Sequence, residues 1–273
     1  NDLLVKSDSC KNSKNIKKTI EEYQYISHQQ SYAFKDNIIF GAMPSIISDK
    51  KKYSNEIFRE QYAQSYFETT LSKSLIQERI DISILKDLTK YFATYTSEIC
   101  NIANLADNLK IDARTITKYI SILESLHLIN IIRPYKNGYV QEMRAQTKIH
   151  IADTGLATSY LQYDSYEDLS VDLRGRLFET NLVNNIIATN QYSFNKYENK
   201  FFRSKKHEVD FVIANNHQII AIEIKSGINV SSKWFSGLIE LSNMAKQQNK
   251  KFVGIVIYAG EHYSKTEIDG CYI

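Results

Sequence analysis

The chain has 273 residues, of which 43% are hydrophobic and 24% charged, and its formal net charge is +3. These values are ordinary for a globular protein, and the net charge is too small to make the whole chain a polyanion binder. Cys10, Cys100 and Cys271 lie far apart without C-x-x-C spacing, which argues against a disulfide framework or a zinc site. No apolar run approaches the roughly 18 residues needed to span a bilayer, so we expect a cytoplasmic protein with no membrane partner.

Residues 1–80 are predicted to form a helical first domain. Residues 14–34 carry apolar side chains at near-helical spacing, and a second helix is expected from Asn55 to about Arg79. Between them, the stretch FGAMPSII at residues 40–47 interrupts the pattern with a glycine and a proline.

Residues 81–150 predict a winged helix. Helices are expected over 84–96, 101–109 and 112–129, the last with Asp112 as its N-cap. Two short helices, a tight turn and a longer helix are the helix-turn-helix arrangement. Two apolar segments then flank Lys136-Asn137-Gly138, and an Asn-Gly pair is typical of a tight β-hairpin.

This region also carries the residues predicted to contact DNA. They are four groups on the third helix and one on the wing: Arg114, Thr115, Thr117, Lys118 and Lys136. The wing adds Arg144 and Lys148 to its positive side chains. Against DNA contact, residues 97–133 contain four basic and four acidic side chains, whereas DNA-binding surfaces usually have a basic excess. A structural or protein-binding role therefore stays open.

Residues 151–273 predict a third domain with the order helix, three strands, helix, strand. The helices are expected over 173–190 and 232–249, and the strands over 198–204, 208–214, 218–226 and 251–260. Strands interleaved with helices indicate a mixed sheet covered by helices, so the fold class is α/β, or α+β for the whole chain.

Four charged side chains in this third domain occur within apolar runs. Glu179 falls near the centre of the apolar stripe of its helix, and Asp210, Glu223 and Lys225 lie in or against buried strands. A turn centred on Asn215-Asn216 would place Asp210 opposite Ala221 and diagonal to Glu223. Three carboxylates gathered with one ammonium repel one another unless a cation binds, and oxygen ligands suit magnesium or manganese.

A helix with Glu, a strand with Asp and a strand ending in Glu-x-Lys resemble the PD-(D/E)xK nuclease superfamily, whose core has the same element order. The resemblance implies a restriction-endonuclease-like αβββαβ core with Glu179, Asp210, Glu223 and Lys225 as catalytic residues. It also implies metal ligation by Glu179, Asp210, Glu223 and the carbonyl of Ile224, and a lysine that helps to activate water.

The ordered stretches IHIADTGLATSYL, GRLFETNLVNNII, FFRSKKHEVDFVI and AIEIKSG, following a winged helix, resemble the C-terminal region of a prokaryotic family of AAA-type ATPases. FGAMPSII is similar to the Gly-x-Pro segment beyond the ATPase core of that family, so the resemblance runs from about residue 40 to the end. No G-x-x-x-x-G-K-[ST] stretch occurs, so we expect no ATP site in this chain and an ATPase domain or ATPase partner elsewhere.

The sequence therefore predicts a DNA-binding protein with a metal-dependent endonuclease-like domain. The alternative is a non-catalytic nucleic-acid or protein interaction module with an inert nuclease fold. A third interpretation makes the charged residues a structural ion-pair network, in which Lys225 pairs with Glu223, and Arg176 or Arg203 with Glu179.

Overall fold

The computed structural model describes residues 31–53, 56–75, 80–136, 138–192, 197–260 and 271–272. Most of the helix predicted over residues 14–34 lies outside these ranges. Among the described helices, none has both the length and the apolar character needed to cross a membrane.

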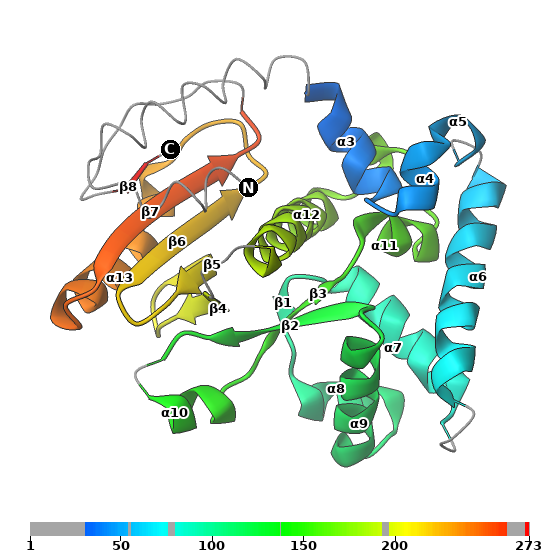
Figure 1. Cartoon of the computed structure of the whole chain (residues 1–273), viewed down its shortest axis with the longest axis horizontal. Helices are drawn as coiled ribbons and strands as arrows, with labels where there is room; N and C mark the ends of the chain where they lie inside the picture. Colours follow the sequence, from blue (N-terminus) through cyan, green and yellow to red (C-terminus); the bar gives the residue numbers. More distant parts are fainter. Residues whose placement is uncertain are drawn as a thin grey trace.

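The described part of the N-terminal region is helical, as predicted (Figure 1). It contains α3 (Ser31–Phe40), α4 (Pro44–Ser48), α5 (Lys50–Tyr53) and α6 (Glu56–Leu75). Pro44 opens α4, a position where its missing N–H costs nothing because the first amides of a helix have no intrahelical acceptor.

Two stretches that are distant in sequence, around Gly41 and around Asp153, pack against each other. Asp153 caps α11 (Thr154–Tyr160) by accepting a hydrogen bond from the Leu156 amide at 2.9 Å, and it also accepts one from the Ala42 amide at 2.7 Å. A Cβ on Gly41 would lie 2.1 Å from the Asp153 carboxylate, and Gly41 has a φ of +70°. Glycine is therefore required where FGAMPSII meets the start of α11.

The three helices predicted over residues 84–129 are present as α7 (Ile82–Thr94), α8 (Ile102–Leu109) and α9 (Ala113–Ser125). Each has a side-chain N-cap, supplied by Asp81, Asn101 and Asp112 respectively. The short β1 (Glu98–Ile99) separates α7 from α8. The interior of this trio is apolar, and Leu85, Leu88, Ile116 and Leu123 are fully buried.

The connection between the next two strands differs from the prediction. β2 (Ile129–Pro134) and β3 (Lys148–Ile151) are antiparallel, as a hairpin requires. However, they are joined by a long connection that contains α10 (Tyr139–Arg144), not by a tight turn at Asn137-Gly138. One reason is tertiary: Glu142 of α10 forms an ion pair with the largely buried ammonium of Lys200 in the neighbouring strand.

The C-terminal region has the predicted element order. It consists of α12 (Val171–Gln191), β4 (Glu198–Arg203), β5 (Glu208–Ala214), β6 (Gln218–Lys225), α13 (Ser236–Gln247) and β7 (Lys251–Tyr258). The described strands form one mixed sheet in the order β1-β3-β2-β4-β5-β6-β7-β8, where β8 is Cys271–Tyr272. The N-terminal strands join this sheet through a short parallel pairing of β2 with β4.

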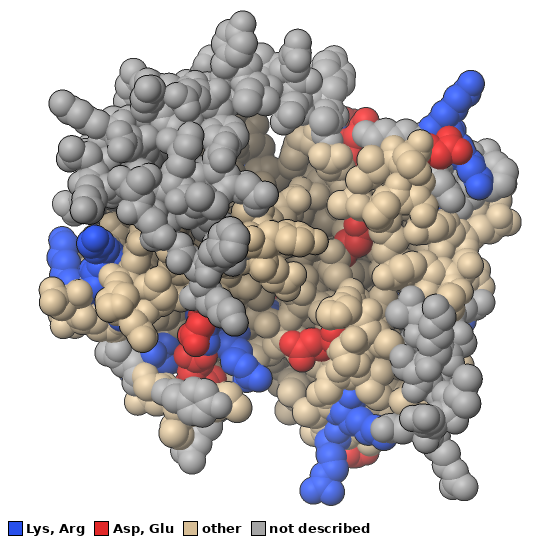
Figure 2. Space-filling model, viewed as in Figure 1, with Lys and Arg blue, Asp and Glu red and all other residues tan. Residues whose placement is uncertain are grey.

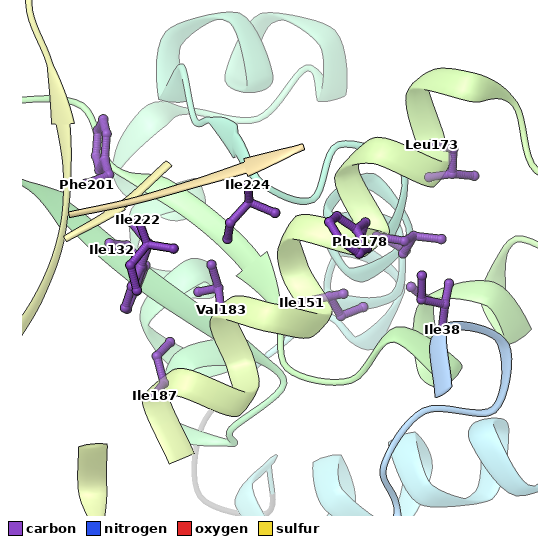
Figure 3. Close-up of a cluster of buried hydrophobic side chains, with 14 of the residues drawn as sticks. Ile38, Ile132, Ile151, Leu173, Phe178, Val183, Ile187, Phe201, Ile222 and Ile224 are labelled. Carbon is purple, nitrogen blue, oxygen red and sulfur yellow. The ribbon is translucent and has the colours of Figure 1, made fainter. Parts of the chain in front are cut away.

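The two faces of β6 are covered by different helices (Figure 1). On one face Ile222 and Ile224 pack with Phe178 and Val183 of α12, and Figure 3 shows these side chains gathered between the helix and the sheet. On the other face Ile219 and Ala221 pack with α13 through a set of fully buried residues that includes Leu238 and Leu241. This burial fixes α12 and β6, which carry three of the four predicted catalytic residues.

Candidate functional site

Glu179 lies on the buried side of α12. It stands between the buried residues Phe178 and Thr180, and its side chain is only 13% exposed. One carboxylate oxygen lies 3.0 Å from the ammonium of Lys148 on β3. Because Glu179 lies on the apolar stripe of the helix, its carboxylate is buried, and the ammonium of Lys148 balances its charge.

Asp210 and Glu223 are closer neighbours than the predicted register implied. Val212, not Asp210, is opposite Ala221, and Phe211 is opposite Ile222. The same register continued by one residue places Asp210 opposite Glu223. The register differs because the turn is centred on Asn216-His217, with the Asn215 amide donating to the Gln218 carbonyl at 3.0 Å. The correction brings the two carboxylates directly alongside each other.

Lys225 joins these two carboxylates. Its ammonium lies 3.1 Å from Asp210 Oδ2 and 2.6 Å from Glu223 Oε1. Asp210 Oδ2 also accepts a hydrogen bond of 2.7 Å from the amide of Ile224. Because the N–H and C=O of one strand residue point the same way, the Ile224 carbonyl is also directed toward the β5 side of β6. The structure thus brings Asp210, Glu223, Ile224 and Lys225 together.

The cation that pairs with Glu179 is Lys148, which was predicted to be one of the basic residues of the wing. Its side chain is only 3% exposed, and besides Glu179 its ammonium lies 2.8 Å from Glu208 and 3.8 Å from Asp210. Lys148 therefore links the helix carboxylate to the strand carboxylates. The signal in the sequence is a lysine followed closely by two apolar strand residues, Ile149 and Ile151.

His150 completes the surroundings of Glu179. It is fully buried, its Nδ1 lies 3.2 Å from the Thr180 hydroxyl, and its Nε2 lies 4.0 Å from the Glu179 carboxylate. Burial and the positive charge of Lys148 both lower the pKa of His150 well below its ordinary value. The ring is therefore neutral at physiological pH and does not add a further positive charge to the site.

Burial and crowding make these carboxylates weak acids. Burial, opposed by Lys148 but assisted by Asp210, raises the pKa of Glu179 to about 8. Burial and the neighbouring Asp210 raise the pKa of Glu223 to about 7. Burial would lower the pKa of Lys148, but Glu179, Asp210 and Glu208 together raise it, so this lysine stays charged.

The predicted ion pair of Lys225 with Glu223 is confirmed. Glu179 is also in an ion pair, but the predicted arginine partner is wrong, because the partner is Lys148. Arg176 pairs with Glu98 at 3.2 Å, and Arg203 lies 3.9 Å from Glu208; neither holds Glu179. With the Arg203 guanidinium counted beside Lys148 and Lys225, the four carboxylates leave a formal deficit of one positive charge.

The donor chemistry fits a hard divalent cation. Glu223 Oε2 is buried without a hydrogen-bond partner among the described residues, so one oxygen of the cluster remains free to bind a cation. The other oxygens come from Asp210 and the Ile224 carbonyl, which are ligand types that magnesium and manganese prefer. Lysines, however, already contact the carboxylates, and within the described residues no group of three His, Cys, Asp or Glu side chains is arranged to hold a metal ion.

An open pocket of about 410 Å³ lies next to this centre. Its lining includes Phe201 and Arg203 of β4, Lys205 of the β4–β5 turn, Lys136 after the end of β2, and Ile99 of β1. Ile99 is the ladder partner of Lys148, whose ammonium lies 5.7 Å from the centroid of the Phe201 ring. The pocket therefore has a basic rim and lies beside the lysine of the acidic centre.

The structure places the predicted DNA-contacting residues of α9 at its N-terminal end. Arg114, Thr117 and Lys118 are exposed, whereas Thr115 is half-buried. The Thr115 hydroxyl donates to the carboxylate of Asp112 at 2.6 Å, and the Thr117 hydroxyl donates to the Ala113 carbonyl at 2.8 Å. Both threonines thus donate to the helix or its N-cap, and the positive charges of Arg114 and Lys118 are what suit this end of α9 to phosphate contacts. Figure 2 shows basic side chains at the lower edge of the molecule, over α8 and α9.

Lys136, the fifth residue predicted to contact DNA, lies apart from α9. Its ammonium donates to the Arg203 carbonyl at 2.8 Å and lines the pocket beside the carboxylates.

Comparison with known proteins identifies two family models. One, described as "Domain of unknown function (DUF8612)", matches residues 31–167, which is half of the chain. The other, described as "Domain of unknown function (DUF4143)", matches residues 174–271. No curated protein and no solved structure matches the chain.

Proposed function

The chain belongs to the family described as a domain of unknown function (DUF8612), and we propose that it is a DNA-binding protein whose C-terminal region carries a metal-dependent nuclease centre. The observation that carries this proposal is the meeting of Asp210, Glu223 and Lys225 at one end of β5 and β6, with Glu179 joined to them through Lys148.

The side chains of β5 and β6 have distinct roles in this proposal. Asp210, Glu223 and the Ile224 carbonyl would hold one magnesium or manganese ion, which would polarise a phosphate oxygen and lower the pKa of bound water. Lys225 holds both carboxylates in place and carries a positive charge at the centre. An ammonium there orients a nucleophilic water by hydrogen bonding and stabilises negative charge on the phosphate.

Two basic surfaces support DNA as the substrate. The rim formed by Lys136, Arg203 and Lys205 beside the centre suits a polyanionic backbone. The helix trio and the antiparallel β2–β3 pair support a winged helix, in which Arg114 and Lys118 of α9 would contact the duplex. Such a module would position DNA without reading much sequence, since phosphate contacts carry no base information.

The resemblance to AAA-type ATPases extends this proposal to a partner. The stretches that carry the resemblance include FGAMPSII and the start of α11, which pack against each other through Asp153. Because the chain contains no P-loop motif, ATP would be bound by a separate domain or protein. The nuclease centre would then act on DNA delivered by that ATPase.

The proposal is tested by incubating the full chain with supercoiled, linear and single-stranded DNA in magnesium, in manganese and in EDTA. Cleavage is expected with either metal, and not in EDTA or in Asp210→Asn. Lys246→Ala, which removes an exposed charge from α13, is the matched control and should cleave as the wild type does. Equal cleavage by Asp210→Asn and wild type would point to a contaminating nuclease and reject the proposal.

A second candidate function is a non-catalytic DNA-binding module with an inert centre. It is favoured by one observation: ammonium groups already contact Glu179, Asp210 and Glu223, so an ion-pair network satisfies much of the charge. In that case DNA binding by wild type and Asp210→Asn would be equal in the presence and absence of metal, and neither would cleave.

A further inference from the structure

We propose that Lys148 is a permanent internal cation that occupies the position between Glu179 and Asp210, so that the centre accepts one divalent metal ion and not two. This inference rests on the proposed function, in which the unsubstituted chain binds a divalent metal ion. It assigns Lys148 and Glu179 to a supporting pair and leaves Asp210 and Glu223 as the carboxylates that bind the metal.

The geometry shows why Lys148 takes the place of an ion. Its ammonium has three carboxylates around it, at 3.0 Å from Glu179, 2.8 Å from Glu208 and 3.8 Å from Asp210. A lysine with three acidic neighbours and 3% exposure is surrounded as a bound cation would be. A metal ion between Glu179 and Asp210 would have to lie against this ammonium and would be repelled by it.

The backbone holds Lys148 in this position. β3 is paired on both sides, with Glu98 and Ile99 of β1 and with residues 129–132 of β2. Ile149 and Ile151 of the same strand are buried in two different core clusters. Since the strand cannot shift without breaking both pairings, the lysine is a fixed part of the site.

The free oxygens then indicate where a metal ion can still bind. Glu179 and Glu208 are satisfied by Lys148, whereas Glu223 has one carboxylate oxygen, Oε2, that is buried and without a hydrogen-bond partner among the described residues. Asp210 lies beside Glu223, and its Oδ2 atom lies 3.1 Å from the ammonium of Lys225. Asp210 and Glu223 are therefore the carboxylates at which a further cation can bind.

The test measures manganese binding to the full chain by isothermal titration calorimetry, with the stoichiometry as the main readout. Wild type is expected to bind one Mn²⁺, and Asp210→Asn should weaken this binding by about tenfold or more. Glu179→Gln should leave the stoichiometry at one and weaken the affinity far less than Asp210→Asn does, because Glu179 is paired with Lys148 and is not a metal ligand. Lys148→Met should add a second Mn²⁺, and Lys148→Arg, which keeps the charge, should not.

The two proposals fail in different ways. One outcome is that wild type binds no Mn²⁺, Lys148→Met binds one ion, and the double variant Lys148→Met/Glu179→Gln binds none. The proposed metal function is then wrong, and the role of Lys148 stands. If Glu179→Gln weakens the wild-type site tenfold, or a folded Lys148→Met still binds as wild type does, the role of Lys148 is overturned. Should Lys148→Met fail to fold by circular dichroism, the Glu179→Gln result decides alone.

Discussion

The ammonium of Lys148 lies 3.0 Å from the carboxylate of Glu179, and both side chains are largely removed from solvent. Lys148 belongs to the segment matched by the first family model, and Glu179 to the segment matched by the second. The charged centre is therefore assembled from both segments, since the C-terminal one alone would leave Glu179 buried without its cation.

The first prediction concerns the strength of this pair. Lys148→Met should lower the free energy of unfolding by about 3 kcal/mol, because it leaves buried carboxylates without their partner. Adding Glu179→Gln should recover part of the loss, giving a coupling energy of about 1–3 kcal/mol in a double-mutant cycle measured by urea denaturation. Lys246→Met, at an exposed position, is the control and should have little effect. Strictly additive changes for the two sites would contradict the pairing.

The second prediction concerns pH. The raised pKa values, about 8 for Glu179 and about 7 for Glu223, compare with an ordinary 4.5 in the unfolded chain. The folded state thus holds protons that the unfolded state releases, and the resulting stability is present below pH 4.5 and lost as pH rises through 7 and 8. In EDTA, urea denaturation should show stability falling from pH 5.5 to 8.5, and the fall should be smaller in Glu179→Gln.

The exposed Glu198 supplies the control for the pH experiment, because its side chain is 73% exposed. Glu198→Gln should follow the wild-type profile. An identical slope in Glu179→Gln and wild type would show that Glu179 does not titrate in this range.

The third prediction concerns DNA contact by α9. Arg114→Ala and Lys118→Ala should each weaken DNA binding to the same extent for unrelated duplex sequences. Each should also reduce the slope of log K against log salt by about 1, because one phosphate contact is lost. Fluorescence anisotropy at several salt concentrations measures both effects, with Lys246→Ala as the charge-matched control. Unchanged affinity and slope would favour a protein-binding or structural role for this region.

The fourth prediction concerns the contact between α3 and α11. A Cβ on Gly155 would lie 2.2 Å from the Phe40 carbonyl oxygen, so Gly155→Ala should destabilise the protein by about 1–3 kcal/mol. Gly175 in α12 is the matched control, because its nearest neighbour would be the Ser226 hydroxyl at 3.4 Å. Gly175→Ala should be neutral or stabilising by up to about 1 kcal/mol in the same thermal or urea denaturation. Equal effects of the two substitutions would reject the close approach at Gly155.

Local patterns were sufficient to predict the elements of the C-terminal region. Each apolar run from Glu198 to Tyr258 is bounded by polar turn residues, and α12 and α13 carry helical spacing. Side-chain alternation on β6 correctly placed Glu223 and Lys225 on one face. The register of β5 was off by two residues because Asn215 pairs with Gln218 and so starts the turn one position later than expected.

Lys148 and α10 could not be predicted in the same way, because both depend on contacts between distant segments. The burial of Lys148 requires β3 to lie beside α12, and nothing near it in sequence marks Glu179 or Glu208 as its partners. Glu142 in α10 is paired with Lys200 of β4, again across a long stretch of sequence. Local sequence therefore does not identify the partner of either lysine.

Whether one metal ion binds beside Lys148 can be seen by diffraction from crystals of the full chain soaked in manganese, with data collected at the manganese edge. One anomalous peak is expected within bonding distance of Asp210 and Glu223, with the Lys148 ammonium still beside Glu179. No peak at these carboxylates, or a peak between Glu179 and Asp210 with Lys148 displaced, would contradict this expectation.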